Sequence, residues 1–325
     1  MDLRAPLPPD HFVPTPTTDV DKVPTILEPS SIQNLLCRIY LASQMMELSS
    51  ESRFTSIILF RRYVCHFQIL IHKNWQQQHR RHKKDSNPPC NQEMKQIKRH
   101  LGRIAAACLF LGCKAEEEPR RIRDVINLSS ILDFEGIGCV CSTLVSTLAN
   151  DCGDSPSKQT EASIEQSPTK AQPVIIIEST HPPPLDDKYW SDKEQMVSTE
   201  QHLLRQLQFD TLVCHPYRCV LIVMETLRFG NGTNSGLLSP KGSEALICKA
   251  FTVLNEISID AVLGTTILQS DVVTLACAVI SVADAANRTN DDVESMLPDE
   301  WWRALDVKTD ELSSVVQNIN NLIHR

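Results

Sequence analysis

Apolar positions along most of this chain recur every three to four residues, the spacing that places side chains on one face of an α-helix. The first stripe comprises Ile32, Leu35, Leu36, Ile39 and Tyr40, and the second comprises Phe54, Ile57, Ile58, Val64 and Phe67. This spacing predicts a helix that opens at Ser30, with Gln33 completing a capping box, and a second helix after the polar break at 49–50. No segment requires a strand, so the pattern predicts an all-α protein.

The most apolar of the predicted helices runs from about Met94 to Glu116. Between 104 and 113 it is built of Ala, Gly, Cys, Leu, Ile and Phe, which leaves almost no polar face. Such a helix must be buried on most sides, and its small residues let neighbouring helices approach closely. We therefore predict that it is the central helix of a bundle. Pro119 suits the first position of the next helix, whose positive end would face the preceding glutamates.

The second half of the chain repeats this organisation. Its helices are predicted at about 215–229, 239–259, 301–305 and 311–323, in addition to its own central helix, and the helix at about 190–209 belongs to the first half. Residues 274–280 can be laid over residues 105–111, 169 positions earlier, with the same Ala-Cys pair in each. The repeat predicts two consecutive bundles of about five helices each.

Three segments lack helical periodicity. Residues 1–29 carry seven prolines and are predicted to be a disordered tail. A basic loop at about 72–93 and a long polar insertion at about 129–184 interrupt the first bundle. These breaks divide the chain into the tail, a first unit at 30–212 that holds both insertions, and a second unit at 213–325.

Composition narrows the possible functions. The net charge of −8 argues against a general nucleic-acid binder, although a local basic patch is compatible with it. The twelve cysteines form no C-x-x-C pair, which disfavours structural zinc. Eight of them fall in apolar helical patterns, which favours reduced core thiols in an intracellular protein over a disulfide framework. There is no apolar leader, and the longest apolar run of the central helix falls well short of the ~20 residues that span a bilayer, so a soluble protein is predicted.

The sequence contains no recognisable catalytic motif. It contains no Gly-rich phosphate loop, no H-E-x-x-H motif and no G-x-S-x-G motif, and its ten histidines are scattered. We therefore predict no catalytic residue, no metal site and no cofactor, and expect a protein that is not an enzyme.

Two charged residues fall on otherwise apolar helix faces. Glu200 shares its face with Leu203 and Leu207, and Lys114 shares its face with Leu111. An ionised group on an apolar face is costly unless it is paired. The pattern leaves two interpretations open, namely a pair formed within the protein and a pair formed with charges on a partner.

Two basic clusters have equally open interpretations. Arg120, Arg121 and Arg123 follow the central helix and suit a phosphate or an acidic partner, although a solvated helix face is the simpler reading. The run that contains Arg80 and Arg81 has the form of a nuclear localisation signal, which is common by chance in exposed loops.

Three stretches resemble the cyclin family, specifically its transcription-associated members cyclins L, K and Q. The first is AACLFLGCKAEEEPRRIRDVINL, at 106–128. The second is LDDKYW at 185–190, followed by EQMVSTEQHLLRQLQFDTLVCHPYR, and the third is PDEWW at 298–302. The resemblance spans most of residues 30–325. It implies an all-α fold of two tandem five-helix cyclin-box bundles, with a long disordered insertion in the first.

The resemblance also implies a partner and a site. Cyclins bind a cyclin-dependent kinase through the first box, using a lysine at the end of its third helix and a glutamate in its fifth. The matching positions here are Lys114 and Glu200, and we add Glu117, Arg120 and Arg121 as candidate kinase contacts. The implied function is a nuclear regulatory subunit that activates a kinase acting in transcription or RNA processing. Neither a membrane nor direct nucleic-acid binding is expected.

Some features depart from the family. The insertion is long for a cyclin, and without an Arg-Ser-rich tail cyclins K and Q are at least as good a match as cyclin L. Within the insertion, Ser155 and Ser167 lie in S-P-x-K motifs that cyclin-dependent kinases favour, which makes them candidate phosphorylation sites.

One rival interpretation uses the same double fold. General transcription factor TFIIB is a scaffold that binds DNA and protein through two such bundles, without a kinase. That function predicts a basic second repeat, whereas the second repeat here contains the acidic residues Asp291, Asp292, Glu294, Asp299 and Glu300. The kinase-regulating interpretation is therefore preferred, and the scaffold is kept as the alternative.

Overall fold

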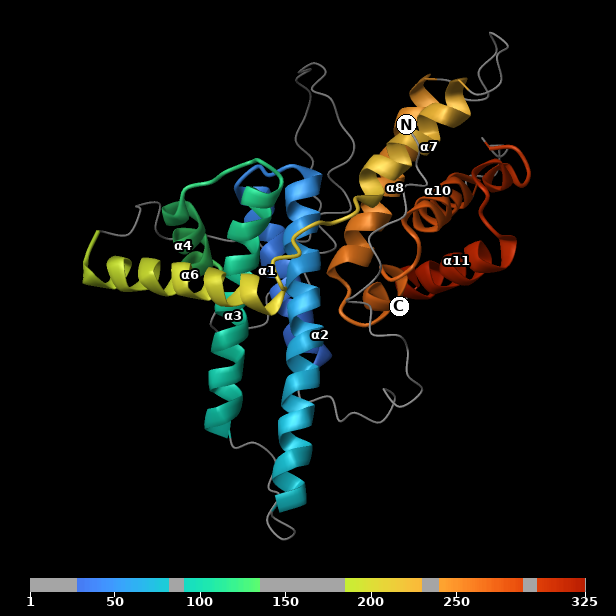
Figure 1. The fold of residues 1–325 in the computed structure, drawn as a ribbon. Coiled ribbons are helices and arrows are strands. Elements are labelled where there is room, and N and C mark those ends of the chain that lie inside the picture. Colours follow the sequence, from blue (N-terminus) through green and yellow to red (C-terminus); the bar gives the residue numbers. More distant parts are fainter. Residues whose placement is uncertain (1–27, 82–90, 135–184, 230–239, 289–296, 325) are drawn as a thin grey trace, which may run out of the picture.

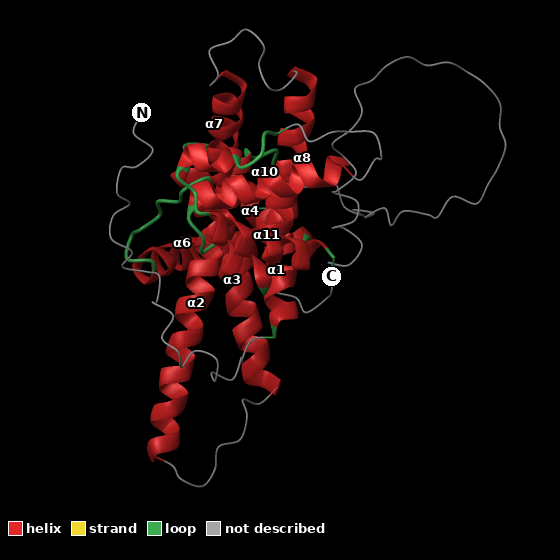
Figure 2. Ribbon diagram, turned by 90° about the vertical axis from the view of Figure 1, so that its right-hand side faces the viewer, coloured by secondary structure: helices red, strands yellow, loops and turns green. Residues whose placement is uncertain are grey.

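The structure is a computed structural model of the 325-residue chain, and it describes residues 28–81, 91–134, 185–229, 240–288 and 297–324. All regular secondary structure in these ranges is helical, with no strand (Figure 2). The all-α prediction is confirmed. None of the described helices is both long enough and apolar enough to span a membrane.

The helices fall into two successive groups along the chain (Figure 1). The first group is α1 (Pro29–Met45), α2 (Ser50–Arg81), α3 (Asn91–Ala115), α4 (Ile122–Ile131) and α6 (Asp187–Gln206). The second is α7 (Pro216–Phe229), α8 (Pro240–Ile259), α9 (Leu263–Ile267), α10 (Val272–Arg288), the 3₁₀ helix η2 (Trp301–Leu305) and α11 (Thr309–Ile323). This arrangement of helices is consistent with the cyclin-box fold.

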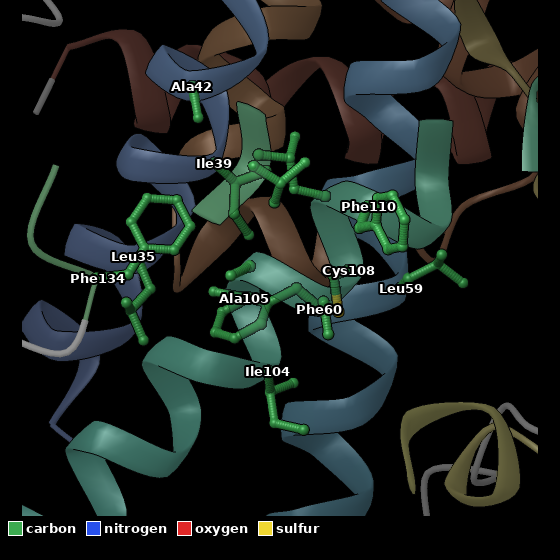
Figure 3. Packing of buried hydrophobic residues seen from close by; sticks show 14 of the residues in the cluster. Leu35, Ile39, Ala42, Leu59, Phe60, Ile104, Ala105, Cys108, Phe110 and Phe134 are labelled. Atoms are coloured by element: carbon green, nitrogen blue, oxygen red, sulfur yellow. The ribbon is translucent and has the colours of Figure 1, made fainter. Parts of the chain in front are cut away.

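α3 is the central helix of the first group, as its composition predicts. Ile104, Ala105 and Cys108 on α3 are fully shielded from solvent. Side chains from α1 and α2 surround them, together with Phe134, which follows α4 (Figure 3). Because apolar surface is favourable to bury at about 25 cal/mol per Å², this enclosure of α3 is the main stabilising contribution to the first bundle.

α10 has the corresponding place in the second group. Its Ala-Cys pair, Ala276 and Cys277, is fully buried in a second apolar cluster. The pair that the two halves share in sequence is therefore buried in both groups. Phe54 from α2 belongs to this second cluster, where its ring lies 5.6 Å from that of Tyr217, edge to face. A helix of the first group therefore contributes to both cores.

α2 and α3 approach one another closely at Gly112. A Cβ at this position would lie 2.2 Å from Ser56 Oγ and 2.9 Å from the Ser56 backbone nitrogen. Only glycine fits such a crossing, because there is no space for a methyl group. The prediction that small residues on the central helix permit close helix packing is confirmed here.

Arg61 on α2 connects the two groups. Its guanidinium donates to the backbone oxygens of Ser258 (2.8 Å) and Asp260 (2.5 Å) and to Thr265 Oγ1 (2.7 Å), all in the α8–α9 region. Burial lowers the pKa of Arg61 to about 10, and the Asp260 carboxylate opposes that shift. The side chain thus stays charged at neutral pH, and its burial requires the acceptors that the second group supplies.

The segments between helices are shorter than the sequence pattern predicted. α2 continues to Arg81 and α3 begins at Asn91, so much of the predicted loop at 72–93 is helical. α4 ends at Ile131, and Leu132 and Phe134 are buried, so 129–134 belongs to the bundle and not to the insertion. Apolar periodicity cannot reveal the part of a helix that extends beyond the core, because no face of that part is buried. Residues 1–27, 82–90 and 135–184, including Ser155 and Ser167, lie outside the described residues.

Two predicted helix starts are wrong. α1 begins at Pro29, one residue inside the predicted tail, with Glu28 as its N-cap and no capping box. Gln33 instead accepts a hydrogen bond from the Ala261 backbone nitrogen (2.7 Å), a contact to the second group that competes with a local cap. α4 begins at Ile122, so Pro119 lies before the helix, because the preceding glutamates bind elsewhere.

Candidate functional site

Lys114 and Glu200 lie against one another at the end of the central helix. Lys114 Nζ donates to Glu200 Oε1 over 2.6 Å, joining the last turn of α3 to α6 across 86 residues of sequence. The Lys114 side chain is 43% exposed, whereas that of Glu200 is 12% exposed. The two charges that looked misplaced in the sequence therefore pair within the protein, and the lysine still faces solvent.

The surroundings of the pair hold the lysine in place. Lys114 Nζ lies 4.1 Å above the centroid of the Phe110 ring, one turn earlier on α3, in a cation–π contact. Its position in the last turn of α3 also favours a positive charge, because the helix dipole is negative at that end. A partner would therefore meet an ammonium group that is already oriented.

The glutamates that follow Lys114 tie α3 to neighbouring helices. Glu116 Oε1 accepts from Thr55 Oγ1 (2.7 Å) on α2 and lies 3.0 Å from His215 Nε2, at the start of the second group. This contact was not predicted from the sequence, because His215 is 99 residues from Glu116 and no local pattern pairs the two residues.

Glu118 caps the beginning of α2. Its carboxylate accepts from the Ser49 backbone nitrogen (3.0 Å), Ser49 Oγ (2.9 Å) and Ser52 Oγ (2.7 Å). Burial disfavours the charged form of Glu118, but these hydrogen bonds and the nearby Arg120 lower the pKa of its carboxyl. The predicted role of the glutamates at the start of the following helix is wrong, since Glu118 serves the N-terminus of α2 instead.

The other predicted contact residues differ in their surroundings. Glu117 is exposed and has a left-handed backbone (φ 56°), which turns the chain away from α3. Arg121 is also exposed and precedes α4 without a capping side chain. Arg120 instead donates to Glu118 Oε1 (3.0 Å) and to the Glu47 backbone oxygen (3.3 Å). Glu117 and Arg121 are thus exposed to solvent, whereas Arg120 is held by the protein.

The second group has no equivalent of this pair. By the 169-residue offset, Ala283 on α10 takes the place of Lys114, and it is completely buried. The exposed ion pair at the end of a central helix is therefore a property of the first group, within the described residues.

A second polar cluster lies deeper, between α2, α3 and α6. The Tyr63 hydroxyl is 2.7 Å from His100 Nε2 and 3.3 Å from His202 Nε2. Burial lowers the pKa of His100, and the neighbouring His202 and Arg103 lower it further. Burial raises the pKa of Tyr63, so its hydroxyl stays protonated and shares a hydrogen bond with His100 Nε2, whose tautomer sets the donor.

The cluster predicts a loss of stability in mild acid. The pKa of His100 is lower in the folded protein than in the unfolded chain. The stability that neutral His100 contributes is therefore complete above the unfolded pKa, near 6.5, and is lost as the pH falls through the folded pKa. We expect the urea midpoint to fall between pH 7.5 and pH 5.5, and to fall less in His100→Gln. Equal pH dependence of both proteins would contradict this role of His100.

The described residues offer no evident catalytic or metal centre. No group of three or more His, Cys, Asp or Glu side chains among them is arranged to hold a metal ion. The eight cysteines in the described ranges are free thiols, and burial raises the pKa of Cys108 and Cys113 on α3, so these remain protonated.

Comparison with known proteins confirms the resemblance to cyclins. No family model matches the chain. It is 26% identical over 190 residues to Cyclin-L1 of Xenopus laevis, a match that covers 58% of this chain and 27% of the relative. It is 23% identical over 229 residues to Cyclin L homolog cyl-1 of Caenorhabditis elegans, covering 70% of this chain and 39% of the relative.

The human protein gives a similar result. Cyclin-L1 of Homo sapiens is 24% identical over 190 residues, covering 58% of this chain and 26% of the relative. The chain thus spans between about a quarter and two fifths of the length of these curated relatives.

Proposed function

We propose that this protein is a cyclin-type regulatory subunit that binds and activates a cyclin-dependent serine/threonine kinase. It would supply no catalytic group of its own. The observation that carries the proposal is the Lys114–Glu200 pair, half exposed at the end of the central helix of the first group. The similarity to cyclin L in several animals supports the same function.

The geometry of the pair suits the recognition of a helix end or loop. Glu200 neutralises and orients the ammonium group of Lys114, whose remaining donors point to solvent and can meet backbone carbonyls of a partner. Glu117 and Arg121 would contact the same partner from the adjoining segment. Phe209 and Leu212, just after α6, are also exposed and add apolar surface for a partner.

Activation of the kinase would follow from the position in which this protein holds it. A protein kinase is active only when the Lys–Glu pair between its β3 strand and its αC helix is formed and its metal-binding loop is in place. A rigid helical surface that docks against the kinase would stabilise that arrangement. Because Ala283 replaces the lysine in the second group, we assign kinase binding to the first unit, 30–212, and leave 213–325 as a separate unit.

The kinase would act in transcription or RNA processing, and the protein would be nuclear. The run at 79–84, the last part of which lies outside the described residues, would serve as the localisation signal. Phosphorylation of Ser155 and Ser167 by the bound kinase remains part of the proposal.

Single substitutions in the pair test the proposal. We expect Lys114→Ala and Glu200→Ala to reduce recovery of co-expressed cyclin-dependent kinase subunits at least tenfold in an affinity pull-down, with a parallel loss of kinase activity. The fold should persist, because a partly exposed ion pair contributes about 1 kcal/mol or less. The matched controls are Lys308→Ala and Glu311→Ala, which remove a 2.7 Å pair on α11 and should change nothing.

Exchanging the two charged residues distinguishes a pair that only stabilises the fold from a pair that also binds a partner. Lys114→Glu with Glu200→Lys retains an ion pair within the protein but inverts the charge presented to a partner. If the pair serves only the fold, the exchanged protein will bind kinase normally. We expect instead that it binds no better than the single variants, and full recovery of the kinase would refute the proposed site.

A further inference from the structure

α2 and α3 extend together beyond the two cores. Figures 1 and 2 show the C-terminal half of α2 and the N-terminal half of α3 side by side, projecting past the other described helices. The buried core residues of α2 end at Val64 and those of α3 begin at Leu101, with Phe67 and Ile97 partly buried against them. We call residues 65–81 of α2 and 91–103 of α3 the helical arm, whose base at 101–103 reaches the core.

The helical arm is strongly basic, although the protein is acidic. The arm contains one acidic residue, Glu93, and seven basic ones, namely Lys73, Arg80, Arg81, Lys95, Lys98, Arg99 and Arg103. Its net charge is therefore 7 − 1 = +6, whereas the rest of the chain carries −8 − 6 = −14. A charge separation of this size attracts polyanions to one end of the molecule and repels them from the other.

The described side chains of the arm make a polar surface. Gln92, Lys95, Gln96 and Arg99 are all exposed, and none of the exposed residues described on this stretch of α3 is apolar. Lys95, Arg99 and Arg103 follow one another at i, i+4 and i+8, so they form a row about 6 Å apart along the helix. On this described stretch of α3, such a row of cations differs from the core of a typical protein interface, which is apolar.

We propose that the helical arm binds the phosphate backbone of a nucleic acid. Regularly spaced Lys and Arg side chains match a linear polyanion, and the exposed amides of Gln92 and Gln96 can also donate to phosphate oxygens. The net charge of the whole chain gave no indication of this basic surface, because the seven basic residues belong to two helices that only the fold brings together.

The arm is remote from the proposed kinase site. Arg99 and Lys114 lie on the same helix 15 residues apart, which corresponds to about 22 Å along its axis. A nucleic acid on the arm would leave Lys114 accessible. The proposal is therefore independent of kinase binding, and each can fail without the other.

Binding of labelled oligonucleotides to the full chain tests the arm. Fluorescence anisotropy in 50 mM salt would be measured with a 20-nucleotide single-stranded RNA and with a 20-base-pair DNA duplex. We expect at least one to bind, and Lys95→Glu/Lys98→Glu/Arg99→Glu to weaken its binding at least tenfold. For RNA, the slope of log affinity against log salt should decrease by about 2, given ~0.7 per lost phosphate contact.

A control of equal charge makes the test specific. Lys249→Glu/Arg303→Glu/Lys308→Glu changes the same number of exposed basic residues in the second group, and we expect it to bind as the unaltered protein does. The arm variant should still recover kinase, which verifies its fold. Lack of binding to both nucleic acids, equal weakening by both triple variants, or equal competition by poly-glutamate, which would indicate an acidic protein partner, would each overturn the proposal.

Discussion

Replacing Arg61 by alanine is expected to lower the free energy of unfolding by about 3 kcal/mol or more. The guanidinium is buried and donates to Ser258, Asp260 and Thr265, and a hydrogen bond to a charged group contributes about 1.5–3 kcal/mol. The substitution removes these donors together and leaves buried carbonyl oxygens without partners. Urea denaturation followed by circular dichroism measures the loss.

Two further variants identify its cause. Arg61→Met keeps most of the side-chain volume but none of the donors, so a loss close to that of Arg61→Ala would assign the effect to hydrogen bonding. Arg62→Ala is the matched control, since Arg62 is adjacent and its side chain is 31% exposed. We expect that control to cost about 1 kcal/mol or less. If Arg61→Ala and Arg62→Ala unfold at the same urea concentration, Arg61 does not hold the two groups together.

Gly112→Ala is expected to destabilise the protein by about 1–3 kcal/mol, although the same change inside an ordinary helix stabilises it by up to about 1 kcal/mol. The sign reverses because the new Cβ would lie 2.2 Å from Ser56 Oγ and 2.9 Å from a backbone nitrogen of α2. The two helices must separate to admit it, which loosens the core on both sides. Thermal or urea unfolding would detect the change.

A second-site change distinguishes crowding from other causes. Ser56→Ala removes the nearest atom but not the backbone contact, so it should recover part of the loss in Gly112→Ala and no more. Additive effects of the two substitutions, or a stabilised Gly112→Ala protein, would show that α2 and α3 are not as close as described.

The helix pattern could be predicted from the sequence because apolar periodicity records which face of each helix is buried. The predicted stripes of α1 and α2, the small residues of α3 and the repeat at α10 are all found in the two cores. This signal ends where α2 leaves its core, which is why its last turns were missed, whereas α9 lies against the second core but is too short, at five residues, to show a helical period. Capping was also misjudged, because Glu118 and Gln33 bind distant backbone groups instead of local ones.

Lys114 and Glu200 could be recognised as unusual from the amino-acid sequence, since each interrupts an apolar face, and so could the all-α fold class. The packing of the helices was needed to show that the two charges meet, that Arg61 and Phe54 of the first group contact the second, and that basic residues of two helices form one arm. Periodicity depends on neighbours within one helix, whereas the partner of a charged side chain depends on which helices pack together.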